Sequence, residues 1–537
     1  MTTEWTGAAA PQGDPAPSHI VADQDATFGF LADPATHGID EAVIRVDTAI
    51  SAVFLAGPLA YKVKRAVRFP YLDFGDLDHR RELCEREIER NRPNAPSIYQ
   101  GVVAITREAD GRLELDGAGE TIEYAVRMRR FDPAQTLDRI AGNGPFDAAM
   151  IDALAAMMAS AHEAAGPREA ESWIADLATY IEQNQTAFLE WPDLFPFERV
   201  HALTEQCRET LSRLTPLLTQ RGRMNHIRLC HGDAHLRNIV LDEGAPVLFD
   251  AIEFDDGIAT GDVLYDLGFL IMDLWERGDR AAANRLMVRY LALTHQADHL
   301  EGIAALAFFM AIRAAIRAKV TAARLPFAGD AERKAVIADA LRYFTTAEKC
   351  VEPTAPALIA IGGLSGTGKS TLAMAIAPDL GRAPGAVVLR TDVERKALFG
   401  VAETDPLPAE AYAREISDEV YHRLMIQART ALAAGQSVII DAVFADPEER
   451  IAVARIAGAV EAPFAGLWLT APAGVLEERV GGRTGDASDA GVIVVRQQLG
   501  YDIGALDWAE IDASGSSADT AESARAALGS LLAPGSA

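Results

Sequence analysis

Hydrophobic residues in the first third of the chain occur in short runs of the kind that form strands. The runs lie at residues 53–55, 60–63, 102–105 and 124–128, and a Gly-Pro turn joins the first two. One stretch with helical periodicity, at about residues 78–92, lies among them. The pattern therefore predicts a small sheet that carries a single helix.

Helical periodicity dominates from residue 146 to residue 349. Short strand-like segments interrupt it around residues 225–229, 239–241 and 247–249. We therefore expect a two-lobed α+β domain at residues 26–350, with a sheet-containing lobe at about 40–130 and a helical lobe at 131–350.

The helical pattern stops at Pro353 and Pro356, which predicts a linker at residues 351–356. In the part that follows, apolar segments alternate with helical stretches. These candidate strands lie at residues 357–361, 386–389, 437–440, 466–469 and 508–511. Such alternation is typical of a parallel sheet with helices on its faces, so residues 357–537 are expected to form an α/β domain.

The composition restricts the compartment and the classes of partner. The chain of 537 residues has 50 Lys and Arg against 78 Asp and Glu, and its formal charge of −28 argues against nonspecific binding to nucleic acid or anionic lipid. Residues 1–25 lack the regions of a signal peptide and are expected to be a disordered lead-in. The most apolar window, residues 302–320, contains three cations and predicts a buried helix rather than a membrane span. The four cysteines form no C-x-x-C pair, which fits a reducing cytoplasm, and the sequence does not indicate a subunit number.

Residues 363–370 read Gly-Leu-Ser-Gly-Thr-Gly-Lys-Ser and match the P-loop pattern G-x-x-x-x-G-K-[ST] at every fixed position. They lie between a predicted strand and a predicted helix, which is the context that this motif requires. In such a loop the backbone N–H groups surround the phosphates of ATP, Lys369 contacts the β and γ oxygens, and the Ser370 hydroxyl binds Mg²⁺. The residues expected to bind ATP are Gly363, Ser365, Gly366, Thr367, Gly368, Lys369, Ser370 and Thr371.

Three charged residues follow the second and third predicted strands of this half. Asp392 is a candidate base for an acceptor hydroxyl, and Arg395 is a candidate ligand for an anionic group of the substrate. Asp441 ends the third strand, a position from which a carboxylate would hold the magnesium ion through water. The competing interpretations are a helix N-cap for Asp392 and a structural turn residue for Asp441.

Two further arginines, Arg479 and Arg483, lie four residues apart beside two glycines. On a mobile segment they would close over the transferring phosphoryl group and offset its charge, although a solvated helix face has the same pattern. Together with the loop, Asp392 and Asp441, this set resembles the small P-loop kinases, such as the gluconate kinase, polynucleotide 5′-hydroxyl kinase and zeta-toxin types. The resemblance covers about residues 357–532.

A second motif lies upstream, His-Gly-Asp-Ala-His-Leu-Arg-Asn at residues 231–238, and Asp250 follows it at the end of a predicted hairpin strand. A loop Asp, an Asn five residues later and an Asp after a strand are the arrangement by which protein kinases supply a base and two metal ligands. Asp233 would therefore orient or deprotonate the acceptor hydroxyl, while Asn238 and Asp250 would hold Mg²⁺ on the nucleotide phosphates. His231 is expected to brace the loop.

The H-G-D-x-H-x-x-N motif resembles the aminoglycoside phosphotransferase family, which has the protein-kinase fold with a distinct helical C-lobe. The resemblance implies an upstream Lys–Glu pair that contacts the α and β phosphates of ATP. We assign Lys62 and Glu87 to this pair. Lys64 lies on the same face of the predicted strand and is the rival of Lys62, and Glu85 is the other candidate on the helix.

The match to the kinase pattern is incomplete. No G-x-G-x-x-G precedes Lys62, where the turn at residues 47–51 reads Asp-Thr-Ala-Ile-Ser, so other backbone or hydroxyl groups must cover the phosphates. Asp250 is followed by Ala-Ile-Glu rather than Phe-Gly, as is common in the small-molecule branch that this half resembles. The resemblance also implies structural roles for Asp262 and Asp266.

A kinase-like half followed by a P-loop kinase half resembles bacterial proteins described as bifunctional aminoglycoside phosphotransferase and ATP-binding proteins. It implies an ATP- and Mg²⁺-dependent phosphotransferase with two active sites, each acting on a hydroxyl of a small molecule. In one alternative, the C-terminal half phosphorylates a 5′-hydroxyl of a nucleotide or polynucleotide, with Arg395 on a phosphate. In another, one half binds ATP without turnover and regulates the other half, which the missing Gly-rich loop favours.

Overall fold

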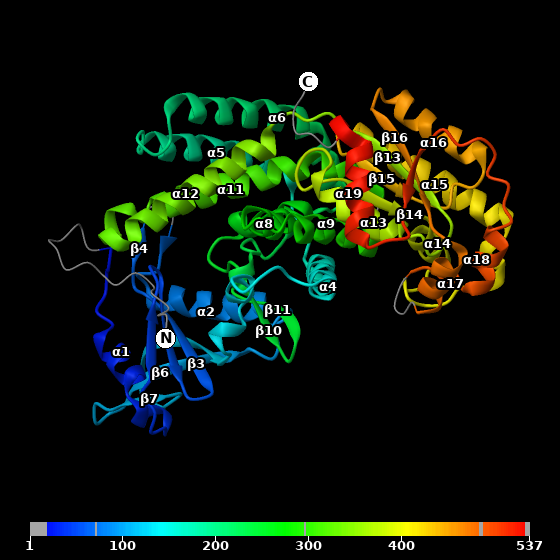
Figure 1. Ribbon diagram of the computed structural model, residues 1–537. Helices are drawn as coiled ribbons and strands as arrows, with labels where there is room; N and C mark the ends of the chain where they lie inside the picture. The colour runs from blue at the N-terminus through cyan, green and yellow to red at the C-terminus, as the bar shows by residue number, and fades with distance from the viewer. Residues whose placement is uncertain (1–18, 70–71, 295–296, 483–486, 532–537) are drawn as a thin grey trace.

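The computed structural model describes residues 19–69, 72–294, 297–482 and 487–531 of the chain (Figure 1). Figure 1 shows a sheet-containing lobe at the N-terminal end, a block of helices in the middle, and a second sheet with its own helices at the C-terminal end. This order confirms the expected fold class, a bilobal α+β domain followed by an α/β domain with a parallel sheet.

The N-terminal lobe is built on an antiparallel sheet with the strand order β1-β2-β3-β8-β6-β7. Its strands are β1 (Ile44–Asp47), β2 (Ser51–Ala56), β3 (Leu59–Lys64), β6 (Tyr99–Arg107), β7 (Leu113–Leu115) and β8 (Glu120–Arg129). A separate two-stranded antiparallel ladder pairs β4 (Arg68–Phe69) with β5 (Leu72–Asp73). Helix α2 (Leu77–Asn91) packs against β6 and β8 and is the helix that the hydrophobic pattern predicts.

The segment before this sheet differs from the expectation. The polar composition predicts a disordered lead-in over residues 1–25, of which residues 1–18 lie outside the described residues. Residues 19–25 pack on the sheet instead: Gln24 Nε2 donates to Lys64 O at 2.9 Å and to Glu123 Oε2 at 2.7 Å, and helix α1 (Asp25–Ala32) follows. A buried amide needs such partners, and finding them on the sheet orders the segment.

Strand β3 turns its two faces to different partners. Tyr61 and Val63 are buried in an apolar cluster with Phe54 of β2. Because side chains alternate along a strand, Lys62 and Lys64 lie on the opposite face. That face meets helix α2, with which both lysines form ion pairs.

Helices α3 to α12 form most of the second lobe. They are α3 (Leu137–Ala141), α4 (Ala148–Ala164), α5 (Ala170–Leu189), α6 (Phe197–Arg223), α7 (Asp256–Ala259), α8 (Val263–Glu276), α9 (Arg280–Thr294), α10 (Ala297–Gly302), α11 (Leu306–Ala322) and α12 (Asp330–Val351). Two short antiparallel ladders pair β10 (Ile239–Asp242) with β11 (Ala245–Leu248) and β9 (Ile227–Leu229) with β12 (Thr260–Asp262). The predicted buried helix is α11, and among the described residues no helix combines the length and apolar character needed to span a bilayer.

Parallel strands form the C-terminal sheet, in the order β14-β15-β13-β16-β17. They are β13 (Leu358–Gly363), β14 (Val387–Arg390), β15 (Val438–Asp441), β16 (Phe464–Thr470) and β17 (Ala509–Asp512). The helices of this domain are α13 (Lys369–Ile376), α14 (Thr391–Phe399), α15 (Arg414–Ala433), α16 (Pro447–Ala459), α17 (Ala473–Gly481), α18 (Val492–Gln498) and α19 (Ser517–Leu528). Each strand overlaps one of the segments that the hydrophobic pattern predicts.

The strand order brings the carboxyl ends of three neighbouring strands to one edge of this sheet. β13 lies beside β15, with Ile361 opposite Asp441, and β15 lies beside β14, with Asp441 opposite Arg390. Open α/β sheets bind their ligands at this edge. The phosphate-loop motif follows β13 and Asp392 follows β14, so the topology gathers the predicted residues of this domain.

The two domains share one hydrophobic core along helix α9. Asn284 of α9 is fully buried and donates through Nδ2 to Ala386 O at 2.9 Å, next to the start of β14. Arg289 Nη1 contacts both carboxylate oxygens of Glu403, at 2.8 and 2.7 Å. The segment between α12 and β13 is therefore not the only connection between the domains.

Candidate active sites

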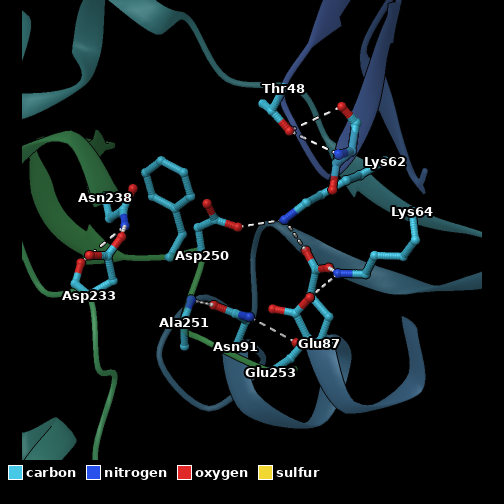
Figure 2. Close-up of polar contacts among 12 residues, drawn as sticks. Thr48, Lys62, Lys64, Glu87, Asn91, Asp233, Asn238, Asp250, Ala251 and Glu253 are labelled. Atoms are coloured by element: carbon cyan, nitrogen blue, oxygen red, sulfur yellow. Dashed lines mark hydrogen bonds and ion pairs between the residues drawn. The ribbon is translucent and has the colours of Figure 1, made fainter. Parts of the chain in front are cut away.

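The first candidate site lies where the N-terminal sheet meets the helical lobe (Figure 2). Lys62 Nζ of β3 donates to Glu87 Oε1 of α2 at 2.9 Å and to Asp250 Oδ1 at 2.6 Å. The Glu87 side chain is fully buried, whereas that of Asp250 is 44% exposed. The structure thus brings the predicted lysine between a buried carboxylate and one that a ligand can reach.

Lys62 and its rival Lys64 have different surroundings. Lys64 is 1% exposed and pairs with two buried carboxylates. Lys62 is 14% exposed and contacts Asp250, one of the predicted metal ligands. Glu85, the other candidate on the helix, lies in an exposed ion pair. The geometry therefore favours Lys62 and Glu87 as the phosphate-binding pair.

The ion pairs keep this pair charged. Burial would lower the pKa of Lys62, but the carboxylates of Asp250 and Glu87 outweigh it and raise the pKa well above its ordinary value. Burial would raise the pKa of Glu87, but Lys62 and Lys64 outweigh it and lower the pKa. An opposite charge within a few ångströms stabilises the ionised form of each group.

Asp250 follows β11 with a left-handed backbone, at a φ of 62°. This conformation is uncommon for residues other than glycine and needs support from neighbours. The N–H of Asp250 donates to Tyr99 Oη at 3.1 Å, and the N–H of Ala251 donates to Asn91 Oδ1 at 2.8 Å. Asn91 lies on α2 one turn after Glu87, so one helix positions both the lysine pair and the Asp250 segment.

Asp233 and Asn238 lie together on the loop after β9 (Figure 2). Asn238 Nδ2 donates to Asp233 Oδ2 at 2.9 Å and to Asp233 O at 3.0 Å. His235 Nε2 lies 3.3 Å from Asp233 Oδ2. Burial would raise the pKa of Asp233, but His235 and Arg317 lower it, so this carboxylate is ionised at neutral pH.

Buried polar groups brace this loop from behind. Asp266 Oδ1 accepts a hydrogen bond from a backbone N–H of the loop at 2.9 Å. His231 Nε2 lies 2.9 Å from Phe249 O, which ties the loop to the strand before Asp250. Asp262 is fully buried in an ion pair with Arg221 at 2.6 Å. These contacts are the structural ones that the sequence predicts for both aspartates and for the histidine.

The second candidate site is the phosphate loop between β13 and α13. Gly363, Gly366 and Gly368 have φ values of 138°, 87° and 90°, which residues with a side chain rarely adopt. A Cβ would lie 2.7 Å from Leu469 O at Gly363 and 2.9 Å from Leu476 O at Gly366. Helix α13 begins directly after the loop, so its N-terminal amides add to the anion-binding character of the loop.

Side chains from the start of α13 and from the ends of β14 and β15 meet beside this loop. Ser370 Oγ donates to Asp441 Oδ2 at 2.5 Å, and Arg390 Nε lies 3.4 Å from the same oxygen. Lys369 Nζ donates to Leu364 O, a carbonyl of the loop, at 3.1 Å. The hydroxyl and the carboxylate that the sequence predicts as magnesium ligands are therefore in direct contact.

Asp392 lies in the first turn of α14, and the N-cap of this helix is Arg390. The N-cap interpretation of Asp392 is therefore wrong. Burial raises the pKa of Asp392, and the nearby charge of Asp441 raises it further. A carboxylate with a raised pKa is a stronger proton acceptor, as a general base requires.

The predicted arginines of this half have structural contacts. Arg395 is buried and donates through Nη1 to Ala411 O at 2.6 Å, which ties α14 to the segment before α15. Arg479 Nη1 donates to Ala513 O at 2.7 Å, just after β17. These contacts favour packing roles for both arginines over the predicted roles at the substrate or the phosphoryl group. Arg483 lies outside the described residues.

Family models match the two halves separately. Residues 86–308 match the phosphotransferase enzyme family, and residues 358–501 match an AAA domain. The chain joins a phosphotransferase domain to a P-loop domain. The first range contains Asp233, Asn238 and Asp250, and the second contains the phosphate loop and Asp441.

Relatives span most of the chain, whereas similar solved structures span part of it. The chain is 29% identical over 461 residues to uncharacterized proteins of Mycobacterium tuberculosis (strain H37Rv) and Mycobacterium bovis, a match that covers 84% of this chain and 88% of theirs. A gluconokinase from Sinorhizobium meliloti 1021 is 23% identical and covers 33% of this chain and 93% of its own, with a TM-score of 0.24. A choline/ethanolamine kinase family protein from Mesorhizobium loti is 15% identical and covers 61% of this chain and 98% of its own, with a TM-score of 0.36.

Sequence reasoning missed two residues that shape the sites, one in each domain. In the phosphotransferase domain, Asn91 holds the segment after Asp250, and its position one helical turn after Glu87 could have indicated this role. In the P-loop domain, Gln498 Oε1 accepts a hydrogen bond from Ser365 N at 2.7 Å. Ser365 and Gln498 lie 133 positions apart, so no local pattern indicates their contact.

Proposed function

We propose that this chain is an ATP- and Mg²⁺-dependent phosphotransferase with two kinase-type sites, each of which phosphorylates a hydroxyl of a small molecule. The observation that carries the proposal is that each domain gathers a lysine, oxygen ligands and a separate carboxylate in one region. In the first domain the lysine is Lys62, the oxygen ligands are Asn238 and Asp250, and the separate carboxylate is Asp233. In the second domain the lysine is Lys369, the oxygen ligands are Ser370 and Asp441, and the separate carboxylate is Asp392. We take residues 351–356 as the boundary between the domains.

The oxygen ligands fit magnesium. Carboxylate, amide and hydroxyl oxygens are the ligand types that Mg²⁺ prefers in proteins. Asp250 is open to a ligand, with 44% of its side chain exposed, and Asp441 already contacts the Ser370 hydroxyl. A magnesium ion bound there would neutralise charge on the phosphate oxygens of the nucleotide.

In the first domain, the ammonium group of Lys62 would bind the phosphates of ATP. Asp233 would accept a hydrogen bond from the acceptor hydroxyl and aim its oxygen at the γ-phosphate. Because its pKa is lowered, Asp233 is a weak base, so its main contribution is orientation. The proton of the hydroxyl would then leave as the new bond to phosphorus forms.

In the second domain, the curled backbone of residues 363–368 and Lys369 would bind the phosphates. Asp392 would accept the proton of the acceptor hydroxyl, and the raised pKa of this carboxylate makes it the stronger base of the two domains. The alternative of a 5′-hydroxyl acceptor gains little support from Arg395, because this side chain is buried and its Nη1 donates to Ala411 O inside the domain.

A calorimetric titration with a non-hydrolysable ATP analogue and Mg²⁺ tests the two sites. We expect two molecules of analogue per chain in the wild type, and one in each of the variants Asp250→Ala and Lys369→Ala. Release of ADP is then followed with a panel of sugars, aminoglycosides and nucleosides to identify the acceptors. A single molecule of analogue per chain, unaltered by Asp250→Ala, would disprove the two-site proposal.

A further inference from the structure

Lys64 is a buried lysine that the proposed mechanism does not use. Its side chain is 1% exposed, and its Nζ pairs with Glu87 of α2 and with Glu253, three residues after Asp250 (Figure 2). Burial would lower the pKa of Lys64, but Glu253 and Glu87 outweigh it and raise the pKa, so the side chain is charged. A buried charge is costly unless it is fully paired. Two carboxylates meet this requirement here and make Lys64 a bridge between them.

The bridge joins three segments that the first site needs in a fixed arrangement. Lys64 ends strand β3, Glu87 lies on α2, and Glu253 belongs to the segment that follows Asp250. The same segment is held nearer its start by Asn91, whose Oδ1 accepts a hydrogen bond at 2.8 Å from the N–H that follows Asp250. The segment after Asp250 is thus joined to α2 directly through Asn91 and, through Lys64, to both α2 and the sheet.

Glu87 uses its two oxygens for two different lysines. Oε1 accepts from Lys62 at 2.9 Å, and Oε2 accepts from Lys64. Lys62 also contacts Asp250 at 2.6 Å, and a turn of its ammonium toward a nucleotide phosphate would draw it away from these carboxylates. With only one lysine, that movement would leave a buried carboxylate without a cation. With Lys64 in place, Glu87 keeps its counter-charge.

We infer that Lys64 is a positioning residue of the first nucleotide site. It holds Glu87 and Glu253 in place, so that Lys62 is free to turn from Asp250 to the nucleotide phosphates and Asp250 is free to bind magnesium. The inference rests on the proposed function of this domain. It assigns to Lys64 no contact with the nucleotide, because its Nζ is enclosed by the two carboxylates. The effect reaches the nucleotide through Lys62 and Asp250.

The test uses the full-length protein with Lys369→Ala in every variant, which removes the lysine of the P-loop domain. Binding of the fluorescent analogue mant-ATP is titrated at a series of Mg²⁺ concentrations. We expect Lys64→Met to weaken binding by about tenfold or more and to raise the Mg²⁺ concentration at half-saturation, because small misplacements of site groups have effects of this size. Lys334→Met, at an exposed lysine far along the chain, is the matched control and should change neither value.

The double variant Lys64→Met/Glu253→Gln separates positioning from simple charge compensation. It removes one charge of each sign, so its melting temperature should lie closer to that of the parent than the melting temperature of Lys64→Met does. A positioning role predicts weak mant-ATP binding in this variant despite the recovered stability. The double variant also carries the test if Lys64→Met does not fold.

Two results would overturn the inference. One is parental affinity for mant-ATP, with the parental dependence on Mg²⁺, in folded Lys64→Met or in the double variant. The other is a parent protein that binds no mant-ATP, which would overturn the proposed function of this domain and the inference with it. The first result leaves the proposed function standing, so the two failures are distinguishable.

Discussion

The two proposed nucleotide sites of this chain are assembled in opposite ways. The P-loop site takes its phosphate-binding groups from consecutive residues, 363–370, and most of these groups belong to the backbone. The phosphotransferase site depends on side chains from distant segments, as in the ion pair between Lys62 and Asp250, which lie 188 positions apart. Affinity for the same kind of ligand can therefore be encoded by local backbone shape or by long-range pairing of charges.

The two constructions are sensitive to different changes. A backbone site tolerates many side chains but is blocked by a Cβ where the loop needs glycine. A site of paired charges tolerates backbone variation, such as the missing Gly-rich loop, but is damaged when one partner leaves another buried without compensation.

The largest expected effect is the loss of one activity at a time. Asp233→Ala should lower kcat/KM for transfer by the phosphotransferase domain about a thousandfold, and Lys369→Ala should do the same for the P-loop domain. Each loss corresponds to roughly 4 kcal/mol of transition-state stabilisation. Positioning and charge neutralisation supply most of the catalysis in phosphoryl transfer, which explains this size. The products of both domains are separated by mass and quantified for each variant.

The melting temperature is the control for this pair of variants, because both should fold as the wild type does. Loss of both products in either variant would contradict two independent sites. A lowered melting temperature together with lowered activity would instead indicate that the substituted residue is structural.

The backbone half of the comparison is tested by Gly363→Ala. At a φ of 138° the added Cβ would lie 2.7 Å from Leu469 O, so we expect a loss of about 3 kcal/mol in the free energy of unfolding. Gly368→Ala is the matched control in the same loop, because its φ is 90° but nothing lies within 4 Å of the added Cβ. Strain alone should cost about 1 kcal/mol there. Equal losses in denaturant unfolding would show that close packing against β16 is unimportant.

The phosphate loop and the two carboxylates beside it could be located from the sequence, because the loop motif carries its own backbone geometry. The positions of Asp441 and Asp392 followed from the ends of predicted parallel strands, which meet at one edge. A substrate-binding role was predicted for Arg395 from spacing along a helix, whereas its contact with Ala411 O favours a packing role. The spacing of residues along a helix shows which of them share a face. Whether that face of α14 points to the site or to the interior depends on the packing of α14 near α15.

The phosphotransferase site could be predicted only in part. The loop with Asp233 carries a local motif, but the choice between Lys62 and Lys64 was left open, since both lie on one face of β3. Burial and the partners of each lysine distinguish them, and those come from distant segments. The order of residues 19–25 was missed for the same reason, because the partners of Gln24 lie 40 and 99 positions away.

The P-loop domain also relies on side-chain support, and this support gives its stability a dependence on pH. Tyr421 Oη accepts from the N–H of Phe444 at 3.2 Å, which supports a left-handed residue in the segment after Asp441. Glu449 forms a hydrogen bond with Tyr421. Burial raises the pKa of Glu449 to about 7, although this hydrogen bond lowers it. The folded chain therefore holds an extra proton between about pH 4.5 and 7, and its stability falls as the pH rises through this window.

Glu449→Gln removes this titration. It should raise the free energy of unfolding by about 2 kcal/mol at pH 8, allowing for partial exposure, and change it little at pH 4.5. Thermal unfolding of the variant and the wild type at the two pH values measures the difference. An equal gain at both values would attribute the effect to packing rather than to ionisation.

The smallest expected effect concerns the interface between the two domains. Arg289 contacts both carboxylate oxygens of Glu403 across the domains, and their side chains are 20% and 19% exposed. Arg289→Ala, which also removes a pair with Asp152 at 3.4 Å, should cost about 1 kcal/mol. Arg496→Ala removes an exposed pair within the P-loop domain and should cost less than about 0.5 kcal/mol. Because the domains share one core, thermal unfolding should show a single transition that shifts as a whole. If instead there are two transitions and only one shifts, the P-loop domain and the phosphotransferase domain unfold separately.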